Sequence, residues 1–257
     1  MRLGRIASPD GVAFVSIEGE EDALVAKEIA EHPFGNPTFT GRSWPLADVR
    51  LLAPILASKV ICIGKNYADH IAEMGGEAPA DPVIFLKPNT SIVGPGAPIV
   101  LPPTSNEVHF EGELAVVIGQ PCKAVPAAKA LSVVLGYTIA NDVSARDHQR
   151  HDGQWTRAKG HDTFCPLGPW IETSLDASDV DIKTEVNGQV KQDSSTAFLL
   201  HDIPKIIEWI SAVMTLLPGD VILTGTPAGV GPIVDGDSVS VTVSGIGTLT
   251  NPVTAKN

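Results

Sequence analysis

The sequence predicts an α+β protein in which β-structure dominates, and three features support this fold class. The 257 residues include 24 glycines and 21 prolines, a frequency typical of many turns between short strands. Short apolar runs rich in valine and isoleucine recur along the chain and favour buried strands. Residues 203–213 alone have the spacing of a long amphipathic helix, with isoleucines at helical intervals after the N-cap candidate Asp202.

A small N-terminal α+β domain is expected over residues 1–55, separate from a larger domain of residues 56–257. The turn Ser8-Pro9-Asp10-Gly11 lies between two apolar runs, which indicates a β-hairpin. A short helix is expected over residues 23–31. No chemical motif occurs in this part of the chain, so we expect it to cover the larger domain or dock onto it.

The larger domain is expected to contain most of the strands. Apolar runs bounded by turn residues predict strands at 59–64, 82–87, 99–101, 108–119, 133–142, 170–172, 182–186, 221–223 and 239–243. The Asn187-Gly188 turn indicates a hairpin, because Asn-Gly is the strongest short hairpin signal. A short helix is also expected over residues 123–131.

Composition and charge argue against several classes of function. The formal net charge of −12 leaves no basic surplus to neutralise phosphates, so we expect no nucleic-acid partner. No apolar run approaches the roughly 18 residues of a membrane helix, so we expect no membrane partner. Cys62, Cys122 and Cys165 show no paired spacing and no secretory leader is recognisable, which predicts a reducing, cytoplasmic location.

The clearest chemical signal is a pair of glutamates at the start of an apolar strand. Side chains two residues apart in a strand project from the same face, with α-carbons about 7 Å apart, so Glu111 and Glu113 should converge. Two like charges beside a core are costly unless a positive charge lies between them. A divalent cation with oxygen ligands is the simplest such charge. The alternative is a solvent-exposed strand face on which both glutamates are ordinary surface residues.

Two further charged residues are candidates for the same site. Asp142 ends the predicted strand 133–142 and is the third candidate metal ligand, although an aspartate there could instead cap the following turn. Lys159 precedes Gly160 in a polar turn. In an acidic site Lys159 would be a cation placed for an anionic substrate, whereas elsewhere a lone lysine in such a turn is simply solvated.

His70 and Glu73 form a candidate acid–base pair. If residues 65–74 are helical, these two side chains share a face, and the carboxylate would raise the pKa of the imidazole and orient it. The small, turn-rich residues 75–82 follow, so this segment could close as a lid over a metal site. The alternative is an exposed helix pair that contributes only about 0.2–0.5 kcal/mol.

The loop 224–231 reads Thr-Gly-Thr-Pro-Ala-Gly-Val-Gly. It lacks the GK[ST] sequence of a Walker loop and the strand–GxGxxG–helix context of a dinucleotide-binding site. Its amides and hydroxyls could hold a carboxylate, and a plain turn is the alternative.

Several separated motifs identify a family resemblance when they are taken together. In chain order they are Gly64-Lys65-Asn66-Tyr67-Ala68-Asp69-His70, Phe110-Glu111-Gly112-Glu113-Leu114, Asn141-Asp142-Val143-Ser144-Ala145-Arg146-Asp147, Lys159-Gly160, and Leu217-Pro218-Gly219-Asp220-Val221-Ile222 with Thr224-Gly225-Thr226-Pro227. In order, type and spacing they resemble the fumarylacetoacetate hydrolase family from about residue 58 to the end. The first fifty-odd residues resemble the N-terminal domain of bacterial short members, especially those similar to soluble oxaloacetate decarboxylases.

The resemblance implies a mixed β-sandwich roll that assembles as a homodimer. It implies a Mg²⁺ or Mn²⁺ ion held by Glu111, Glu113 and Asp142. It further implies that Lys159 lies near the metal-bound water and the substrate, with His70 and Glu73 on a closing lid. Three more positions match residues that line the family's substrate pocket, namely Arg146, Gln149 and Thr226.

One departure from the family bears on the substrate. Fumarylacetoacetase itself has a fourth metal carboxylate shortly before its catalytic histidine, whereas this chain reads Ile63-Gly64-Lys65-Asn66 there, with no acid. Three protein carboxylates would leave open positions on the ion for water and substrate. This difference argues against fumarylacetoacetate as the substrate.

The function expected from the resemblance is metal-dependent chemistry on small, anionic 2-oxo acids. A metal-bound pyruvate enolate would form as a carbon–carbon bond breaks, in oxaloacetate decarboxylation or acylpyruvate hydrolysis. Isomerisation of 2-hydroxyhepta-2,4-diene-1,7-dioate, with decarboxylation in aromatic catabolism, is the alternative reaction. Two other classes remain open: a non-enzymatic Ca²⁺ module that holds an acidic ligand, and a family member that has lost catalysis.

Overall fold

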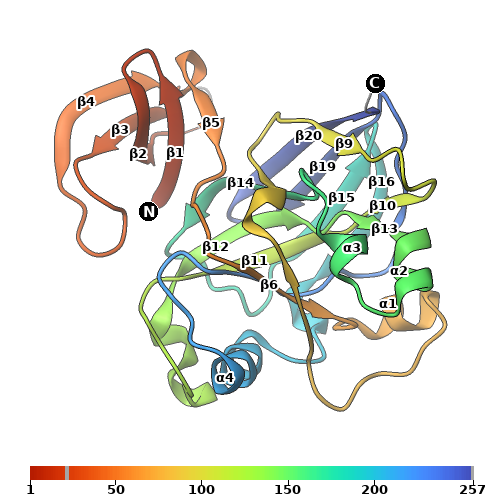
Figure 1. Ribbon diagram of the computed structural model, residues 1–257. Coiled ribbons are helices and arrows are strands. Elements are labelled where there is room, and N and C mark those ends of the chain that lie inside the picture. Colours follow the sequence, from red (N-terminus) through yellow and green to blue (C-terminus); the bar gives the residue numbers. More distant parts are fainter. Residues whose placement is uncertain (21–22, 256–257) are drawn as a thin grey trace.

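The computed structural model describes residues 1–20 and 23–255, which form three β-sheets and a few short helices (Figure 1). The large sheet runs in the order β4 (Phe39–Pro45), β3 (Val25–Ile29), β2 (Gly11–Glu18), β1 (Arg2–Ser8), β14 (Cys165–Glu172), β12 (Val134–Asn141), β11 (Gly112–Ile118), β17 (Val221–Leu223), β6 (Val60–Gly64) and β7 (Val83–Lys87). Two short strands extend it, β5 (Arg50–Leu52) beside β1 and β8 (Ile92–Val93) beside β14.

Two smaller sheets complete the β-structure. One runs β16 (Gln189–Ser195), β15 (Asp181–Val186), β19 (Ser238–Val243), β20 (Gly247–Ala255) and β9 (Ile99–Leu101). The other runs β13 (Ser144–Ala145), β10 (Val108–Phe110) and β18 (Gly231–Pro232). The β-dominated α+β fold class is therefore confirmed.

The helices are short apart from α4 (Ile203–Val213). The Asp202 carboxylate caps α4 by accepting a hydrogen bond from the Lys205 amide at 2.8 Å, as its sequence predicts. The other α-helices are α1 (Ala68–Glu73), α2 (Arg146–Asp152) and α3 (Thr156–Lys159). The 3₁₀ segments are η2 (Leu46–Asp48), η3 (Asn89–Ser91), η4 (Ala127–Val133) and η5 (Thr196–Phe198), and η4 replaces the helix expected over residues 123–131. No helix among the described residues is long and apolar enough to span a membrane.

One expectation for the N-terminal part is confirmed and one is wrong. The hairpin is present, with β1 and β2 paired from Arg2↔Ile17 to Ser8↔Gly11. The helix expected over residues 23–31 is instead strand β3, which pairs with β2 on one side and β4 on the other. Two neighbouring strands satisfy its backbone, and the buried Glu28 carboxylate accepts hydrogen bonds from Arg42 of β4. This tertiary context outweighs the weak local preference for helix.

The N-terminal strands are continuous with the large sheet, because β1 pairs with β14 at Arg2↔Glu172 and Leu3↔Ile171. In Figure 1 the red and orange strands of residues 1–55 form the lobe on the left, and the β14–β12–β11 strands lead from it toward the centre. The chemistry-bearing segments α1, α2 and α3 lie on the other side of the molecule.

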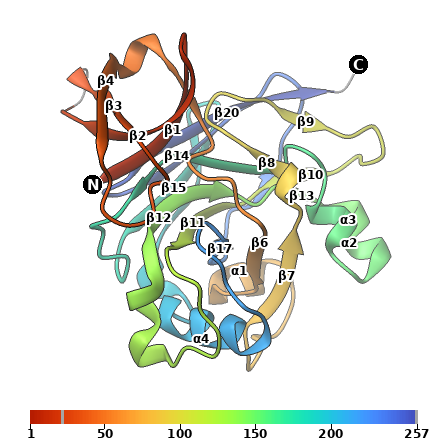
Figure 2. The same cartoon turned by 60° about the vertical axis from the view of Figure 1, so that its left-hand side comes forward.

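The main hydrophobic core lies between the large sheet, the five-stranded sheet and α4. It combines Leu114, Val116 and Ile118 of β11 with side chains of β12, β15, β19 and α4. Two sheets therefore face each other across this core, as in a β-sandwich. Helix α4 packs beside η4 at one end of the molecule in both views (Figure 1, Figure 2).

Candidate metal centre and cavity

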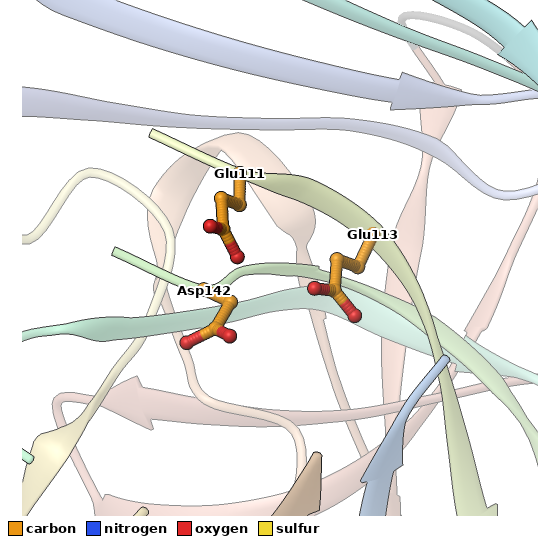
Figure 3. A group of neighbouring side chains, drawn as sticks. All are labelled: Glu111, Glu113 and Asp142. Carbon is orange, nitrogen blue, oxygen red and sulfur yellow. The ribbon is translucent and has the colours of Figure 1, made fainter. Parts of the chain in front are cut away.

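Three carboxylates converge where β11 and β12 meet. Glu111 lies between β10 and β11, Glu113 is the second residue of β11, and Asp142 directly follows β12. One oxygen of each side chain lies within 4.8 Å of the others. Figure 3 shows the three side chains pointing toward a common space. They are 4%, 2% and 1% exposed, which rules out ordinary surface residues on a wet strand face.

The two glutamates converge, but not because they alternate along one strand, as the sequence predicted. The backbone leaves the strand pattern at Glu111, where β10 ends and β11 has not yet begun, so alternation along one strand is not the cause. Instead the Asp142 amide donates to the Glu111 carbonyl at 2.8 Å, and the Glu111 amide donates to Asn141 Oδ1 at 2.9 Å. These bonds place Glu111 and Asp142 side by side.

Gly112 is required for this arrangement. A Cβ atom on Gly112 would lie 2.1 Å from Thr184 Oγ1, too close for any side chain. The Gly112 amide donates to Gln192 Oε1 at 2.9 Å, and its carbonyl accepts from Thr226 Oγ1 at 2.8 Å. Gln192 in turn donates to Thr226 Oγ1 at 2.7 Å. The hydroxyl group of Thr226, an expected pocket residue, thus donates its hydrogen bond to the backbone between the two glutamates.

Three cations balance part of the negative charge. Lys159 Nζ lies 2.7 Å from Glu111 Oε2 and 2.6 Å from Asp142 Oδ2, so this lysine is buried rather than solvated. Arg146 Nη2 lies 2.6 Å from Glu111 Oε1. Burial alone would raise the pKa of Glu111, but Lys159 and Arg146 outweigh burial and hold that pKa well below its ordinary value. Burial lowers the pKa of Lys159, but Asp142 and Glu111 more than compensate and raise it, so the ammonium stays charged.

Lys87 is the third cation, and sequence reasoning assigned it no role. Its Nζ donates to Asp142 Oδ1 at 2.5 Å and to the Val143 carbonyl at 3.1 Å, and the side chain is 1% exposed. The sequence does contain a signal for this role, because Lys87 is the last residue of an apolar strand. Because lysines are almost never fully buried unless paired, such a position calls for a buried carboxylate partner.

Glu113 is the carboxylate without a cationic partner among the described residues. It accepts one hydrogen bond, from the Gly225 amide at 2.6 Å. Burial, together with repulsion from Asp142 and Glu111, raises its pKa well above the ordinary value. A divalent cation between the three side chains would remove this imbalance, and carboxylate oxygens suit Mg²⁺ and Mn²⁺. The donor set therefore fits the metal that the family resemblance implies.

His70 and Glu73 lie on one face of α1, as expected for a helix. His70 Nδ1 is 3.2 Å from Glu73 Oε2, and the His70 side chain is buried. The Gly229 amide donates to Glu73 Oε1 at 3.0 Å. When the Glu73 carboxylate accepts a hydrogen bond from the Nδ1–H group, Nε2 of His70 is the ring nitrogen that can exchange a proton with a ligand. The loop 224–231 thus holds two carboxylates of the chain itself, Glu113 through Gly225 and Glu73 through Gly229.

These groups border one cavity of about 260 Å³. Its wall includes eight of the nine residues expected at the site: His70, Glu111, Glu113, Asp142, Arg146, Gln149, Lys159 and Thr226. Glu73, the ninth, reaches the site through its bond to His70. Gln149 is held by Arg146, whose Nη1 donates to Gln149 Oε1 at 2.9 Å.

Two aromatic residues line the cavity, and no pattern in the sequence predicts that they do. Phe85 and Trp155 meet edge to face with ring centroids 5.1 Å apart, and Lys159 Nζ lies 5.1 Å from the Phe85 ring centroid. Gly64 makes room for the indole, because a Cβ there would lie 2.5 Å from a Trp155 ring atom. No local pattern in the sequence links these three positions, because Gly64 is in β6, Phe85 is in β7 and Trp155 lies between α2 and α3.

Comparison with known proteins agrees with this geometry. Residues 59–254 match the family model "Fumarylacetoacetate (FAA) hydrolase C-terminal", and residues 1–54 match "Rv2993c-like, N-terminal". A structure described as 5-carboxymethyl-2-hydroxymuconate delta-isomerase from Mycobacterium smegmatis is 75% identical, with a TM-score of 0.95 and full coverage of both chains.

Two further relatives have related descriptions. A structure described as 2-hydroxyhepta-2,4-diene-1,7-dioate isomerase from Mycobacterium marinum is 70% identical, with a TM-score of 0.95, covering 100% of this chain and 99% of the other. Oxaloacetate tautomerase Fahd2a, mitochondrial, from Rattus norvegicus is 44% identical over 81% of this chain and 71% of its own length. The chain therefore belongs to the fumarylacetoacetate hydrolase family, whose members include isomerases, hydrolases and tautomerases.

Proposed function

We propose that this protein is a divalent-metal-dependent enzyme that acts on small 2-oxo acids through an enolate of their pyruvate unit. The observation that carries the proposal is the cluster of three buried carboxylates within 4.8 Å, bordering one cavity with Lys159 and His70. A cavity of about 260 Å³ suits a substrate smaller than a drug-sized ligand. A Mg²⁺ or Mn²⁺ ion held by Glu111, Glu113 and Asp142 would supply Lewis-acid stabilisation of negative charge on the substrate's oxygens.

Charge on the substrate would also meet two cations of the chain. Lys159 has three N–H groups and directs two of them at Glu111 and Asp142, which leaves one for a substrate oxygen in the cavity. Arg146 lies on the other side of Glu111 and orients Gln149. Because these groups are buried, their charges act with little screening by water.

His70 is the proton carrier in this proposal. Glu73 fixes its Nδ1 side, and the Gly229 amide fixes Glu73, so Nε2 is oriented before substrate arrives. In oxaloacetate decarboxylation, the C3–C4 bond breaks to release carbon dioxide and His70 delivers a proton to C3. In acylpyruvate hydrolysis, His70 and Glu73 would take a proton from a water that attacks the acyl carbon. The bond from that carbon to C3 breaks, the pyruvate enolate leaves, and His70 returns the proton to C3.

A second outcome from the same enolate is proton transfer without carbon–carbon cleavage. The descriptions of the relatives favour it: two structures at least 70% identical are called isomerases, and the 44% identical relative is called an oxaloacetate tautomerase. In this reaction His70 would remove a proton from one position of the substrate skeleton and return it to another position or to the enol oxygen. Isomerisation of 2-hydroxyhepta-2,4-diene-1,7-dioate therefore stays as the alternative reaction.

The experiment is a substrate panel with Mg²⁺ or Mn²⁺, read by product identification with NMR. The panel holds oxaloacetate, acetylpyruvate, fumarylpyruvate and 2-hydroxyhepta-2,4-diene-1,7-dioate. Each reaction is compared with metal alone and with the Glu113→Gln variant, because free metal ions also promote reactions of oxaloacetate. Metal-dependent turnover of one or more substrates supports the proposal; no turnover above both controls for any substrate contradicts it.

Two proposals concern organisation rather than chemistry. We propose that residues 1–55 and 56–257 are separate domains, and the matches of two different family models to residues 1–54 and 59–254 support this division. We also propose a homodimer, on the strength of the family resemblance. Light scattering of the purified protein tests the second proposal, and a monomer at micromolar concentration contradicts it.

A further inference from the structure

The cationic side chains of the cavity wall differ in one respect, which is whether a carboxylate already neutralises them. Arg146 is paired with Glu111, and Lys159 with Glu111 and Asp142. Arg150 is paired with Glu107 outside the cavity. Of the Lys and Arg side chains that line the cavity, Lys65 alone has no carboxylate partner within ion-pair distance among residues 1–20 and 23–255.

The backbone at Lys65 is unusual for a lysine. Its φ of 58° lies in the left-handed region, which residues with a side chain adopt rarely and which clusters at functional sites. This conformation follows directly on β6 and carries the side chain toward the segment after α1. A Cβ placed on Gly76 of that segment would lie 3.5 Å from Lys65 Nζ. Lys65 and Gly76 both line the cavity and both are exposed, so this part of the cavity wall borders solvent.

The three carboxylates that line the same cavity are buried and negatively charged, in contrast to the exposed, positively charged Lys65. Between charged groups the wall includes the apolar rings of Phe85 and Trp155, which suit a carbon chain. A ligand that fits this distribution has one polar end for the carboxylate cluster with its metal, a short carbon skeleton, and a negative charge at its other end.

We propose that Lys65 binds the second carboxylate of the substrate, so that the enzyme prefers dicarboxylic over monocarboxylic 2-oxo acids. This inference rests on the proposed function for one point, that the 2-oxo acid end lies at the carboxylate cluster. Lys65 is then a specificity residue that contacts substrate away from the reacting atoms. Its loss should weaken binding of dicarboxylic ligands and leave monocarboxylic ligands unaffected.

The test is calorimetric titration of the Mg²⁺-loaded protein with a matched pair of ligands that differ at one end. 2-Oxoglutarate and 2-oxovalerate have the same five-carbon skeleton, and the first ends in a carboxylate where the second ends in a methyl group. We expect the wild-type protein to bind 2-oxoglutarate about tenfold more tightly, the factor of one charge-assisted hydrogen bond. In Lys65→Met the two affinities should agree within about twofold, and Lys65→Arg should restore the preference.

Arg150→Met is the matched control, because it removes another cation from the cavity wall that Glu107 already neutralises. It should keep the preference for 2-oxoglutarate. If Lys65→Met does not fold, Lys65→Asn replaces it, since asparagine tolerates the left-handed backbone. A wild-type protein without the preference, a Lys65 variant that keeps it, or an Arg150 variant that loses it would each overturn the inference.

The inference and the proposed function fail separately. A ligand preference that depends on Lys65, in a protein that turns over no substrate of the panel, would leave the inference standing and remove the proposed function. Metal-dependent turnover, combined with a preference for 2-oxoglutarate that survives in Lys65→Met, would support the proposed function and overturn the inference about Lys65.

Discussion

The carboxylate cluster and the α1 segment border the same cavity and are built in different ways. Every side chain of the cluster is buried and is held by a backbone amide or by cations from other segments of the chain. In the α1 segment, residues 72–78 are all exposed, and Met74 is 50% exposed. Asn66 anchors one end of this segment through bonds to the Thr224 and His201 carbonyls.

This difference indicates that the metal site is preformed, whereas proton transfer depends on the α1 segment. The cluster needs no contribution from α1, so metal binding should not depend on that helix. The acid–base pair depends on a segment with few buried contacts, which is the kind of segment that opens at low free-energy cost. Variants that separate metal binding from proton transfer therefore test the comparison.

The largest effect is expected for Glu113→Gln. The change removes a metal ligand, so kcat/KM should fall by about a thousandfold or more, the upper range for loss of one charge-stabilising group. Because Glu113 lacks a cationic partner, the neutral amide should also raise the melting temperature of the metal-free protein. Steady-state kinetics with Mg²⁺ measures the fall in kcat/KM, and scanning calorimetry with and without Mg²⁺ measures the melting temperatures. Retained turnover, or an unchanged Mg²⁺-induced shift in melting temperature, would remove Glu113 from the ligand set.

His70→Ala should abolish proton transfer and leave metal binding intact. Loss of the proton carrier is expected to lower kcat by about 10²–10⁴-fold. The Mg²⁺ affinity measured by calorimetry should change by less than about twofold, because His70 lies outside the cluster. An unchanged rate with every substrate would show that the α1 segment has no catalytic role.

Lys87→Met tests whether the cluster depends on its buried cations. Removing one partner of a buried ion pair leaves Asp142 less compensated, and the free energy of unfolding should fall by about 3 kcal/mol. Lys183→Met is the matched control, since Lys183 pairs with Glu185 at 3.6 Å on the surface and should cost less than about 0.5 kcal/mol. Urea unfolding of both variants measures the difference. Equal stability would mean that Lys87 does not balance the cluster.

The smallest effect is expected at Asp147, which fixes the first turn of α2 and so the wall that carries Arg146 and Gln149. Burial raises the pKa of Asp147, but hydrogen bonds from Ser105, Asn106 and His148 outweigh it and lower the pKa to about 2. A carboxyl with a lowered pKa stabilises the fold above its ordinary pKa of 3.8 and loses that contribution as the pH falls toward 2.

Asp147→Asn should therefore reduce the free energy of unfolding by about 1 kcal/mol at pH 7. The difference between wild type and variant should shrink as the pH falls from about 4 to about 2. Urea unfolding at several pH values measures this difference. A difference that stays constant over that pH range would show that the carboxylate charge is not the cause.

Much of the site could be predicted from sequence because its motifs are local. Glu111 and Glu113 flank a glycine at the start of an apolar run, and His70 and Glu73 are three residues apart in a short helix. Local spacing is enough to place His70 and Glu73 on one face of α1. It predicts that the two glutamates converge, but the bonds of Glu111 with Asn141 and Asp142, rather than strand alternation, orient Glu111. Asp142 was identifiable as the polar end of a strand, and only the pairing of β12 with β11 brings it to Glu111.

The parts that sequence reasoning missed depend on contacts between distant segments. Lys87 is buried because Asp142, 55 residues later in the chain, accepts a hydrogen bond from its ammonium group. Gln192 holds Gly112 from 80 residues away. The local sequence of residues 23–31 predicts a helix, but pairing with β2 and β4 makes the central residues of this segment a strand. No local pattern encodes partners at such separations.

The proposed chemistry depends on Glu111, Glu113 and Asp142 together binding one divalent ion. The most direct measurement is a crystal structure of the protein grown with Mn²⁺, in which anomalous scattering locates the metal without reference to activity. We expect one Mn²⁺ ion per chain, ligated by an oxygen of each of the three carboxylates. A carboxylate cluster that stays bonded to Lys159 and Lys87 alone at saturating Mn²⁺, with metal absent or bound elsewhere, would contradict it.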